Sequence, residues 1–411
     1  MLSQILALFS AAYMFFVTMQ PSLLPETRGY SGPVQAGTSM PADKHGVWPT
    51  KGDFPEGNRP WWLMPNLLKA VYGIRAYRND RGTKTNSMLV LYKGKIVYEE
   101  YSGSALNPFL VEGTGTGRDA LRQMASGGKS FLSALVGIAI AEGHIKGVDQ
   151  KVIDFFPDAK IPKGQESKRD MTVGHLLTMT SGLPGMNDPG GMDYVYASIF
   201  EPEMQEIIEQ AFEEAYSLGY LKALRTDTAR TLFESSPQQS SPGRAYSYSP
   251  QGTDVLAGLV SRAVGMPYEE YAKRKLFAPI GIAKYDWMKL ADGTAMGAGG
   301  LSLRSRDMLK FGWLYLNYGR WDNRQVVPAA WVAQSSPRGV TPQGYGRLFW
   351  NVPFAPISGY GANGAGGQYI DIFPRWDLVI VRTGESRIDS FMRELVASMP
   401  EMPDEGMALA G

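Results

Sequence analysis

The sequence predicts an α+β fold, in which an antiparallel sheet is flanked by helices and joined to a second, mostly helical lobe. The first observation is that β-prone apolar runs with hairpin turns lie near both ends, at 87–101 and 368–384. The second is that the chain between them is largely helical in pattern, with long loops containing Gly and Pro. Pairing the two hairpins in one sheet is the simplest closure, and it leaves the helical middle as a separate lobe.

Size and charge agree with a globular protein of two lobes. The 411 residues exceed the usual size of one core, which is about 250–300 residues. Lys and Arg number 41 against 40 Asp and Glu, with no basic stripe and no acidic tail. We therefore expect a well-mixed surface and no nucleic-acid partner.

Scarce residue types exclude several chemistries. The chain has no Cys, which removes thiolate nucleophiles, disulfides and thiolate metal sites. Its three histidines, His45, His144 and His175, include no pair at metal-ligand spacing, and His175 fits a helix face or a cap. No Walker-type or dinucleotide-binding fingerprint follows a strand. We expect no metal and no cofactor, and proton chemistry carried by Lys, Tyr or carboxylates.

The N-terminus is the one membrane-like feature. Leu2–Met19 is nearly uncharged and long enough for a signal-peptide core or a short anchor, although it lacks a basic start and a clean cleavage site. We expect residues 1–22 to be a signal peptide or an N-terminal membrane anchor. The protein would then be exported in a bacterium, to the periplasm or to the membrane through this segment. Residues 23–60, rich in Pro, Gly and Ser, predict a linker or extended arm.

The main domain is expected at 61–400, with its sheet lobe built from both ends and a helical lobe at about 140–300. Residues 401–411 would form a tail. The first hairpin is expected to turn at Lys93-Gly94 and the second around Pro374–Asp377. SRIDSFMRELVASM then has the spacing of an amphipathic helix.

The pair Ser126 and Lys129 opens an apolar run, SFLSALVGIAIAEG, that ends at Gly143. A helix starting at Ser126 would place both side chains on one face, within mutual reach. Free N–H groups at the helix start would favour a developing oxyanion, and a desolvated lysine could act as base. The alternative is an N-cap serine beside a surface lysine. The glycines between them weaken a helix start but allow a substrate close to the backbone, which argues mildly against that alternative.

Two further stretches suit the same chemistry. In PGRAYSYSPQGTDVLAGLV a loop presents Tyr248 before a helix that starts near Gln251, and a phenol beside Lys129 could relay a proton. Packing is the alternative for this tyrosine. In GYGANGAGGQYIDIFP several glycines precede an apolar strand, whose edge could lie against a substrate and offer a backbone N–H. A flexible turn before a hairpin is the alternative there.

Taken in order, these stretches resemble the serine hydrolases related to class C β-lactamases and D-alanyl-D-alanine carboxypeptidases. That family includes lactamase-like esterases and 6-aminohexanoate-dimer hydrolases. The resemblance covers about residues 85 to 385. It rests on SGGKSFLSALVGIAIAEGHIKGVDQKVIDFFPD, MTVGHLLTMTSGL, PGRAYSYSPQGTDVLAGLVSRAVG, GAGGLSLRSRDMLKFGWLYLNYGRW and GAGGQYIDIFP.

The resemblance implies a β-lactamase/transpeptidase-like fold and a set of site residues. Ser126 would be the acylated nucleophile, Lys129 its general base and Tyr248 the tyrosine of the second motif, favoured over Tyr246 by the Pro-Gly six residues before it. The backbone N–H of Gln368 would join that of Ser126 in the oxyanion hole.

Residues next to this set are expected to contact the substrate. The resemblance places Ala365, Gly366 and Gly367 in the third motif. The loop SGLPGMNDPGGMDYVY could border the cleft between the lobes and contribute Asp188, Asp193 and Tyr194, with an ordinary surface loop as the alternative.

Two departures from the family pattern affect recognition. Pro250 stands where the second motif usually has Asn or Ser, and it cannot donate a side-chain hydrogen bond. Ala365 replaces the usual Lys or His, a cation that would bind the carboxylate of a β-lactam or of a peptide C-terminus.

We therefore expect a serine hydrolase of carboxylesterase or amidase type, acting on a small-molecule ester or amide. β-Lactamase or D-Ala-D-Ala peptidase activity is the alternative within the class, and an inactive ligand-binding relative is the alternative outside it. The oligomeric state is open.

Overall fold

The protein is described from a computed structural model. It describes residues 53–58, 85–101, 115–186, 188, 218–335, 341, 344–354 and 357–384.

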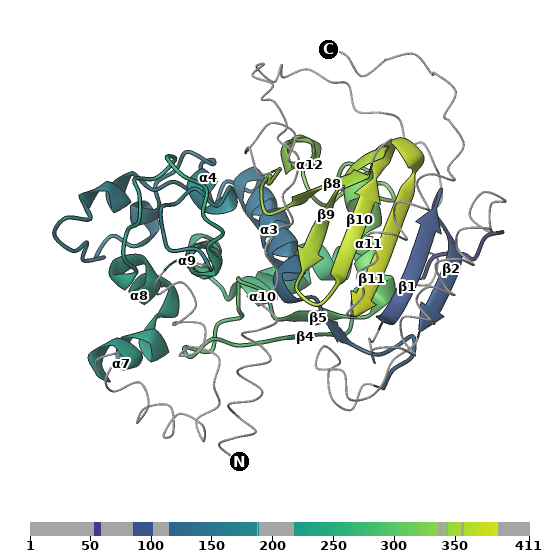
Figure 1. The fold of residues 1–411 in the computed structure, drawn as a ribbon, viewed down its shortest axis with the longest axis horizontal. Helices are drawn as coiled ribbons and strands as arrows, with labels where there is room; N and C mark the ends of the chain where they lie inside the picture. Colours follow the sequence, from purple (N-terminus) through teal and green to yellow (C-terminus); the bar gives the residue numbers. More distant parts are fainter. Residues whose placement is uncertain are drawn as a thin grey trace, which may run out of the picture.

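A six-stranded antiparallel sheet forms one side of the molecule (Figure 1). The strand order is β2-β1-β11-β10-β9-β8, and β1 pairs directly with β11, with Leu89 opposite Val381. The two hairpins from opposite ends of the chain therefore share one sheet, which confirms the predicted closure. The strands are β1 (Thr85–Tyr92), β2 (Lys95–Tyr101), β8 (Trp350–Phe354), β9 (Ile357–Gly364), β10 (Gln368–Phe373) and β11 (Leu378–Gly384).

Helices form the other side of the molecule, with α3 between them and the sheet (Figure 1). Within this helical lobe, α9 packs against α8, α3, α4 and α10. The helices are α3 (Lys129–Ala141), α4 (Val173–Leu177), α7 (Leu218–Thr226), α8 (Thr228–Ser235), α9 (Pro250–Val264), α10 (Tyr268–Ala272), α11 (Ser305–Leu316) and α12 (Ala329–Ser335). The predicted α+β architecture, with an antiparallel sheet and a helical lobe, is confirmed.

Helix α3 is the central element of the fold. Residues 129–139 are all buried, as expected for a helix that is apolar on every side. Gly137 is required for its packing, because a Cβ there would lie 2.4 Å from the Trp331 ring of α12. The helix ends at Ala141, and Gly143 follows with φ +79°, so the predicted stop signal is correct.

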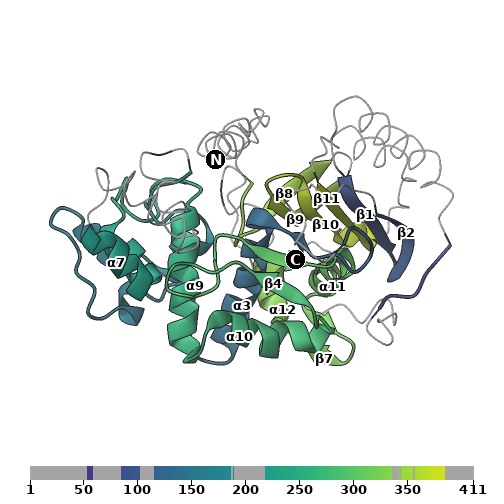
Figure 2. The same ribbon diagram turned by 90° about the horizontal axis from the view of Figure 1, so that it is seen from below.

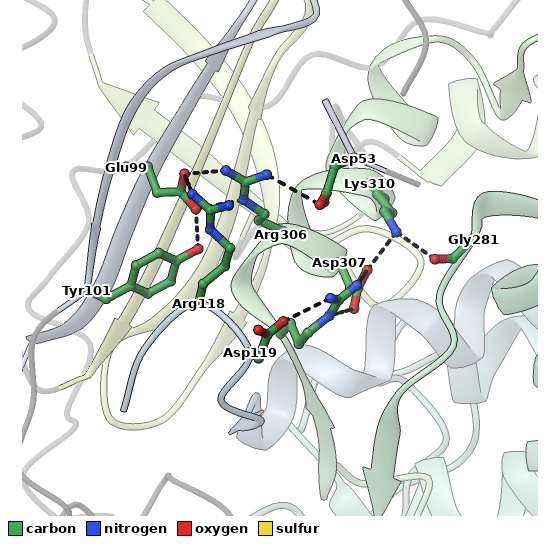
Figure 3. Close-up of polar contacts among 10 residues, drawn as sticks. Asp53, Glu99, Tyr101, Arg118, Asp119, Gly281, Arg306, Asp307 and Lys310 are labelled. Atoms are coloured by element: carbon green, nitrogen blue, oxygen red, sulfur yellow. Dashed lines mark hydrogen bonds and ion pairs between the residues drawn. The ribbon is translucent and has the colours of Figure 1, made fainter. Parts of the chain in front are cut away.

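Helix α11 covers one face of the sheet (Figure 2). The contact is close at Gly312, where a Cβ would lie 2.4 Å from Val379 Cγ1 and 2.9 Å from Ile370 Cγ2. Figure 3 shows the charged side chains at the start of this helix, among them Arg306 beside Glu99 of β2 and Lys310 beside Asp307. The Arg306–Glu99 pair ties α11 to the edge strand of the sheet, whereas Asp307 and Lys310 pair within α11 itself.

Smaller elements complete the described part of the chain. The sequence pattern did not predict the three-stranded sheet β3-β5-β4, whose strands are too short for a clear period. These elements are β3 (Arg122–Gln123), β4 (Tyr285–Trp287), β5 (Leu301–Leu303), the pair β6 (Arg320–Trp321) and β7 (Arg324–Gln325), the 3₁₀ turns η1 (Ala125–Gly128), η2 (Val152–Phe155), η3 (Glu166–Asp170), η5 (Ala278–Ile280) and η6 (Pro374–Trp376), and the π turn η4 (Lys273–Phe277).

One expectation for the Gly-rich run was incomplete. Residues Gly359–Gly364 belong to strand β9 itself, and only the next three residues form the turn to β10. The glycines allow close strand pairing, because a Cβ at Gly361 would lie 2.6 Å from Ile370 O.

Several predictions fall outside the described residues: the N-terminal segment 1–22, most of the arm 23–60, the helix at 386–399 and the tail 401–411. Within the described ranges, every helix is too short or too polar to cross a membrane.

Candidate active site

Ser126 lies in the 3₁₀ turn η1, directly before α3, and its side chain is half-buried. Ala125 just before it has φ +46°, a left-handed conformation that a residue with a Cβ rarely adopts. Such local strain is typical of residues that present a functional group. Gly127 N–H donates to Met124 O at 2.9 Å, which closes the turn. The Ser126 N–H belongs to the first turn of the helical segment, where N–H groups lack intrahelical acceptors.

Lys129 is the first residue of α3, one turn after Ser126, and it is only 1% exposed. Its Nζ lies 2.9 Å from Ser126 Oγ and also donates to the carbonyl oxygen of Ala298. The same Nζ lies 5.1 Å from the centroid of the Tyr248 ring. The structure therefore brings Ser126, Lys129 and Tyr248 together, as the sequence predicted, and shows that Lys129 is not a surface lysine.

Tyr248 directly precedes Ser249, the N-cap of α9, whose Oγ accepts from Gly252 N–H at 3.1 Å. Its ring stacks on Trp350 at 5.5 Å and meets Tyr345 edge-on at 5.8 Å. Trp350 and Tyr345 hold the Tyr248 ring next to Lys129. Tyr248 therefore both packs against other aromatic rings and lies beside the lysine, so the two interpretations of this tyrosine are compatible.

Tyr246, the rejected alternative, is placed differently. Its hydroxyl is buried and has no hydrogen-bond partner in the described part of the chain. Burial, and to a smaller extent the nearby Tyr248, raises the pKa of Tyr246 far above its usual range. Burial likewise raises the pKa of Tyr345 well above its ordinary value, with smaller contributions from Tyr248 and Tyr246, so that Tyr345 stays a neutral phenol.

The end of β9 packs against the Ser126 turn. A Cβ at Gly364 would lie 2.0 Å from Met124 O and 3.0 Å from Gly127 N, so only glycine fits there. The strand that reaches the Ser126 turn at backbone distance is therefore β9, which contains the glycines, and not the apolar strand after them, whose edge the sequence suggested.

Hydrogen-bond alternation shows which backbone groups of β9 face away from β10. Asn351 N–H donates to Gly344 O and so points away from β9. Backbone groups of successive strand residues point to opposite sides, so the N–H and C=O of Trp350 point toward β9, where Trp350 lies opposite Gly361. Gly361 bonds to β8, and the alternate residues Asn363 and Ala365 lie on the same side, beyond the last β8 pair.

Gln368 lies on β10, opposite Gly364, and is 1% exposed. Because Gly364 directs its backbone groups at β10, the backbone N–H of Gln368 is used inside the hairpin. Its side-chain Nε2 donates to Gly366 O at 2.8 Å. The pairing therefore favours Ala365 or Asn363 over Gln368 as a donor toward the serine.

Ala365, Gly366 and Gly367 form the turn between β9 and β10. Gly366 and Gly367 have φ of +75° and +77°, which explains the two glycines. The turn begins next to Gly364 and hence next to the Ser126 turn.

Asp188 supports the loop that carries Tyr248. Its Oδ2 accepts from Gly185 N–H at 2.7 Å and from Ser247 Oγ at 2.7 Å, and Met186 N–H donates to Tyr248 O at 2.9 Å. Its carboxylate is thus occupied within the protein. Asp193 and Tyr194 lie outside the described residues.

Of the three histidines, His45 lies outside the described residues, and the other two make contacts elsewhere. His175 forms a capping box at the start of α4, accepting from Thr172 N–H through Nδ1 at 3.2 Å. Burial lowers its pKa, and Asp149 opposes that shift. His144 Nε2 lies 3.6 Å from Glu142 Oε2. In the described ranges, no three acidic or histidine side chains gather as a metal site.

Sequence reasoning missed four contributors to the site: Ala298, Asp254, Tyr345 and Trp350. Ala298 acts through its carbonyl oxygen, which no residue pattern reveals. Asp254 accepts from Ala298 N–H at 2.9 Å, and its place inside an apolar helix was the only available signal.

Comparisons with known proteins concern the sequence and the fold of the chain. A family model described as Beta-lactamase matches residues 74–384. The 6-aminohexanoate-dimer hydrolase of Paenarthrobacter ureafaciens is 26% identical over 321 residues, which cover 73% of this chain and 72% of that protein. Among solved structures, EstCE1, a hydrolase with promiscuous acyltransferase activity, has a TM-score of 0.62 at 14% identity, covering 81% of this chain and 98% of its own. The octameric penicillin-binding protein homologue of Pyrococcus abyssi has a TM-score of 0.58 at 18% identity, covering 81% and 76%.

Proposed function

The chain belongs to the beta-lactamase family, and on that premise we propose that it is a serine hydrolase that cleaves an ester or small amide through an acyl-enzyme on Ser126. The observation that carries the proposal is the 2.9 Å separation of Lys129 Nζ and Ser126 Oγ in a buried setting. A neutral lysine at that distance can take the serine proton without a histidine.

In the first half-reaction, Ser126 Oγ attacks the substrate carbonyl carbon while its proton passes to Lys129 Nζ. The bond from the carbonyl carbon to the leaving oxygen or nitrogen then breaks, and the leaving group takes up a proton through Tyr248. In the second half-reaction, water gives its proton to the same groups and attacks the acyl carbon, which releases the acid and restores Ser126.

The oxyanion of each tetrahedral intermediate needs two N–H donors. One is the Ser126 N–H at the start of the helical segment. We assign the second to the outward edge of β9, at Ala365 or Asn363, because alternation points the Gln368 N–H into the hairpin.

The proposed substrate class follows from what lies beside this pair. Ala365 offers no cation for a substrate carboxylate, whereas an ester or a small amide requires none. The rings of Tyr248 and Trp350 offer apolar surface near the lysine. The name of one relative, 6-aminohexanoate-dimer hydrolase, supports a hydrolytic reaction.

The test is a substrate panel on the full chain: short-chain p-nitrophenyl esters, small linear amides and a chromogenic cephalosporin. We expect ester or amide turnover, and a loss of about a thousandfold or more in kcat/KM for Ser126→Ala. Ser133→Ala makes the same chemical change further along α3 and should leave the rate unchanged.

The remaining outcomes separate the alternatives. Full activity in Ser126→Ala contradicts the proposal. Cephalosporin turnover faster than ester turnover would favour β-lactamase or peptidase activity. A folded wild type that neither turns over any substrate nor reacts with a fluorophosphonate would be the inactive ligand-binding relative.

A further inference from the structure

The loop 295–300 is wedged between α9 and the Ser126 turn. A Cβ at Gly297 would lie 2.3 Å from Thr253 O of α9, and a Cβ at Gly299 would lie 2.7 Å from Ala125 O. Neither contact leaves room for a side chain, so the loop touches both elements with its backbone. Any shift of this loop would reach the residue next to Ser126.

Side chains from three elements fix this loop by hydrogen bonds. Tyr268 Oη donates to Met296 O at 2.9 Å, and Trp287 Nε1 donates to Met296 O at 3.1 Å and to Gly299 O at 3.0 Å. Between these anchors, Asp254 Oδ1 accepts from Ala298 N–H at 2.9 Å. The Asp254 side chain is 1% exposed, and a buried N–H group that loses its acceptor is costly, so this hydrogen bond should hold the Ala298 peptide in place.

The carbonyl of the same residue, Ala298, accepts from Lys129 Nζ. A neutral lysine has two N–H bonds and one lone pair. When one N–H bond points at Ala298 O and the ring of Tyr248 lies close to Nζ, few rotations of the amine remain. The lone pair can then be directed at Ser126 Oγ, 2.9 Å away.

We propose that Asp254 is a positioning residue for the general base: it orients Ala298, whose carbonyl holds Lys129 toward Ser126. Helix α9 thereby positions both partners of the lysine, with Tyr248 just before its N-cap and Asp254 in its second turn. The inference rests on the proposed function, because it assigns Lys129 the role of base.

Two nearly isosteric variants of the full chain test the role. Asp254→Leu removes the acceptor, whereas Asp254→Asn keeps an oxygen able to accept from Ala298 N–H. We expect Asp254→Leu to lower kcat for an ester about 10- to 100-fold with KM within about threefold, because misplacing a base by a fraction of an ångström slows chemistry more than binding. Asp254→Asn should retain most of kcat. Thr253→Val, which removes a buried hydroxyl that donates to Pro250 O in the same helix, is the matched control and should keep wild-type kcat.

The outcomes are decisive in each direction. Wild-type kcat in a folded Asp254→Leu variant overturns the inference, and so does a Asp254→Asn variant as slow as Asp254→Leu. If Asp254→Leu fails to fold, Asp254→Asn decides alone, since retained kcat supports an acceptor role and lost kcat contradicts it. Failure of the proposed function is recognised separately, by a wild type without turnover or by an active Ser126→Ala variant.

Discussion

At the scale of single residues, the site depends on positions where no side chain fits. Gly364 is the clearest case, because a Cβ would lie 2.0 Å from the Met124 carbonyl oxygen. Its φ is not in the left-handed region, so the reason for glycine is contact and not backbone conformation. The absence of a side chain lets β9 approach the Ser126 turn closely enough to offer a backbone N–H.

Gly364→Ala should therefore separate the strand edge from the serine. We expect kcat/KM to fall about 10- to 100-fold, less than the roughly 100- to 1000-fold loss on removal of an oxyanion donor, because the methyl group displaces the donor and does not remove it. Steady-state ester hydrolysis measures the effect. Gly117→Ala adds the same methyl group where nothing lies within 4 Å and should change little. Equal rates in the two variants would contradict the assigned role of the β9 edge.

At the scale of elements, helix ends in the lobe are satisfied by buried side chains. Lys168, in η3, donates through Nζ to three carbonyl oxygens at the C-terminus of α8: Phe233 at 3.0 Å, Glu234 at 2.9 Å and Ser236 at 2.6 Å. These carbonyls have no intrahelical partner, and a cation suits that end of the helix dipole. Burial lowers the pKa of Lys168 to about 8, while Glu234 opposes the shift.

This shift predicts how stability depends on pH. The folded pKa of about 8 lies below the unfolded value of 10.5, so the unfolded chain binds more protons between these values. The free energy of unfolding attributable to Lys168 should therefore rise with pH from about 8 upward. Denaturant titrations of wild type and Lys168→Met, from pH 7 to 9.5, measure the difference between the two proteins. A difference that stays constant across that range would contradict the lowered pKa.

At the scale of the whole molecule, the fold is closed by contacts between distant parts of the chain. Arg306 of α11 binds Glu99 of β2, with Nε 2.7 Å from Oε1, and also lies 3.5 Å from Asp53 (Figure 3). The Arg306 side chain is 5% exposed, whereas Arg118, which pairs with the same glutamate, is 52% exposed. Burial should therefore decide which of the two arginines stabilises the molecule.

Arg306→Met is expected to cost about 3 kcal/mol of unfolding free energy, because it leaves the Glu99 carboxylate without its buried partner. Arg118→Met changes the same pair of residue types at the surface and should cost less than about 1 kcal/mol. Chemical denaturation of both variants measures the two costs. Similar losses would show that burial does not set the strength of these pairs. The ester hydrolysis rate should stay unchanged in both.

What the sequence determined by itself is local. The helical segment after Ser126, the one-turn spacing to Lys129 and the two hairpins follow from periodicity, turn residues and spacing, which act within a few positions. Even the family resemblance rests on such stretches. The second oxyanion donor is a different case. The resemblance placed it at Gln368, but which N–H faces the site depends on a strand register that the residues alone do not reveal.

Only the tertiary structure decided which backbone groups meet at the Ser126 turn and at Lys129. The Ala298 carbonyl, which accepts from Lys129, and the β9 edge, which packs on the Ser126 turn, come from separate parts of the chain. A backbone carbonyl or N–H is present in nearly every residue, so no sequence pattern marks the one that points at the site. Its direction is set by strand alternation and loop packing, which exist only once α9, the 295–300 loop and the sheet are assembled around the Ser126 turn.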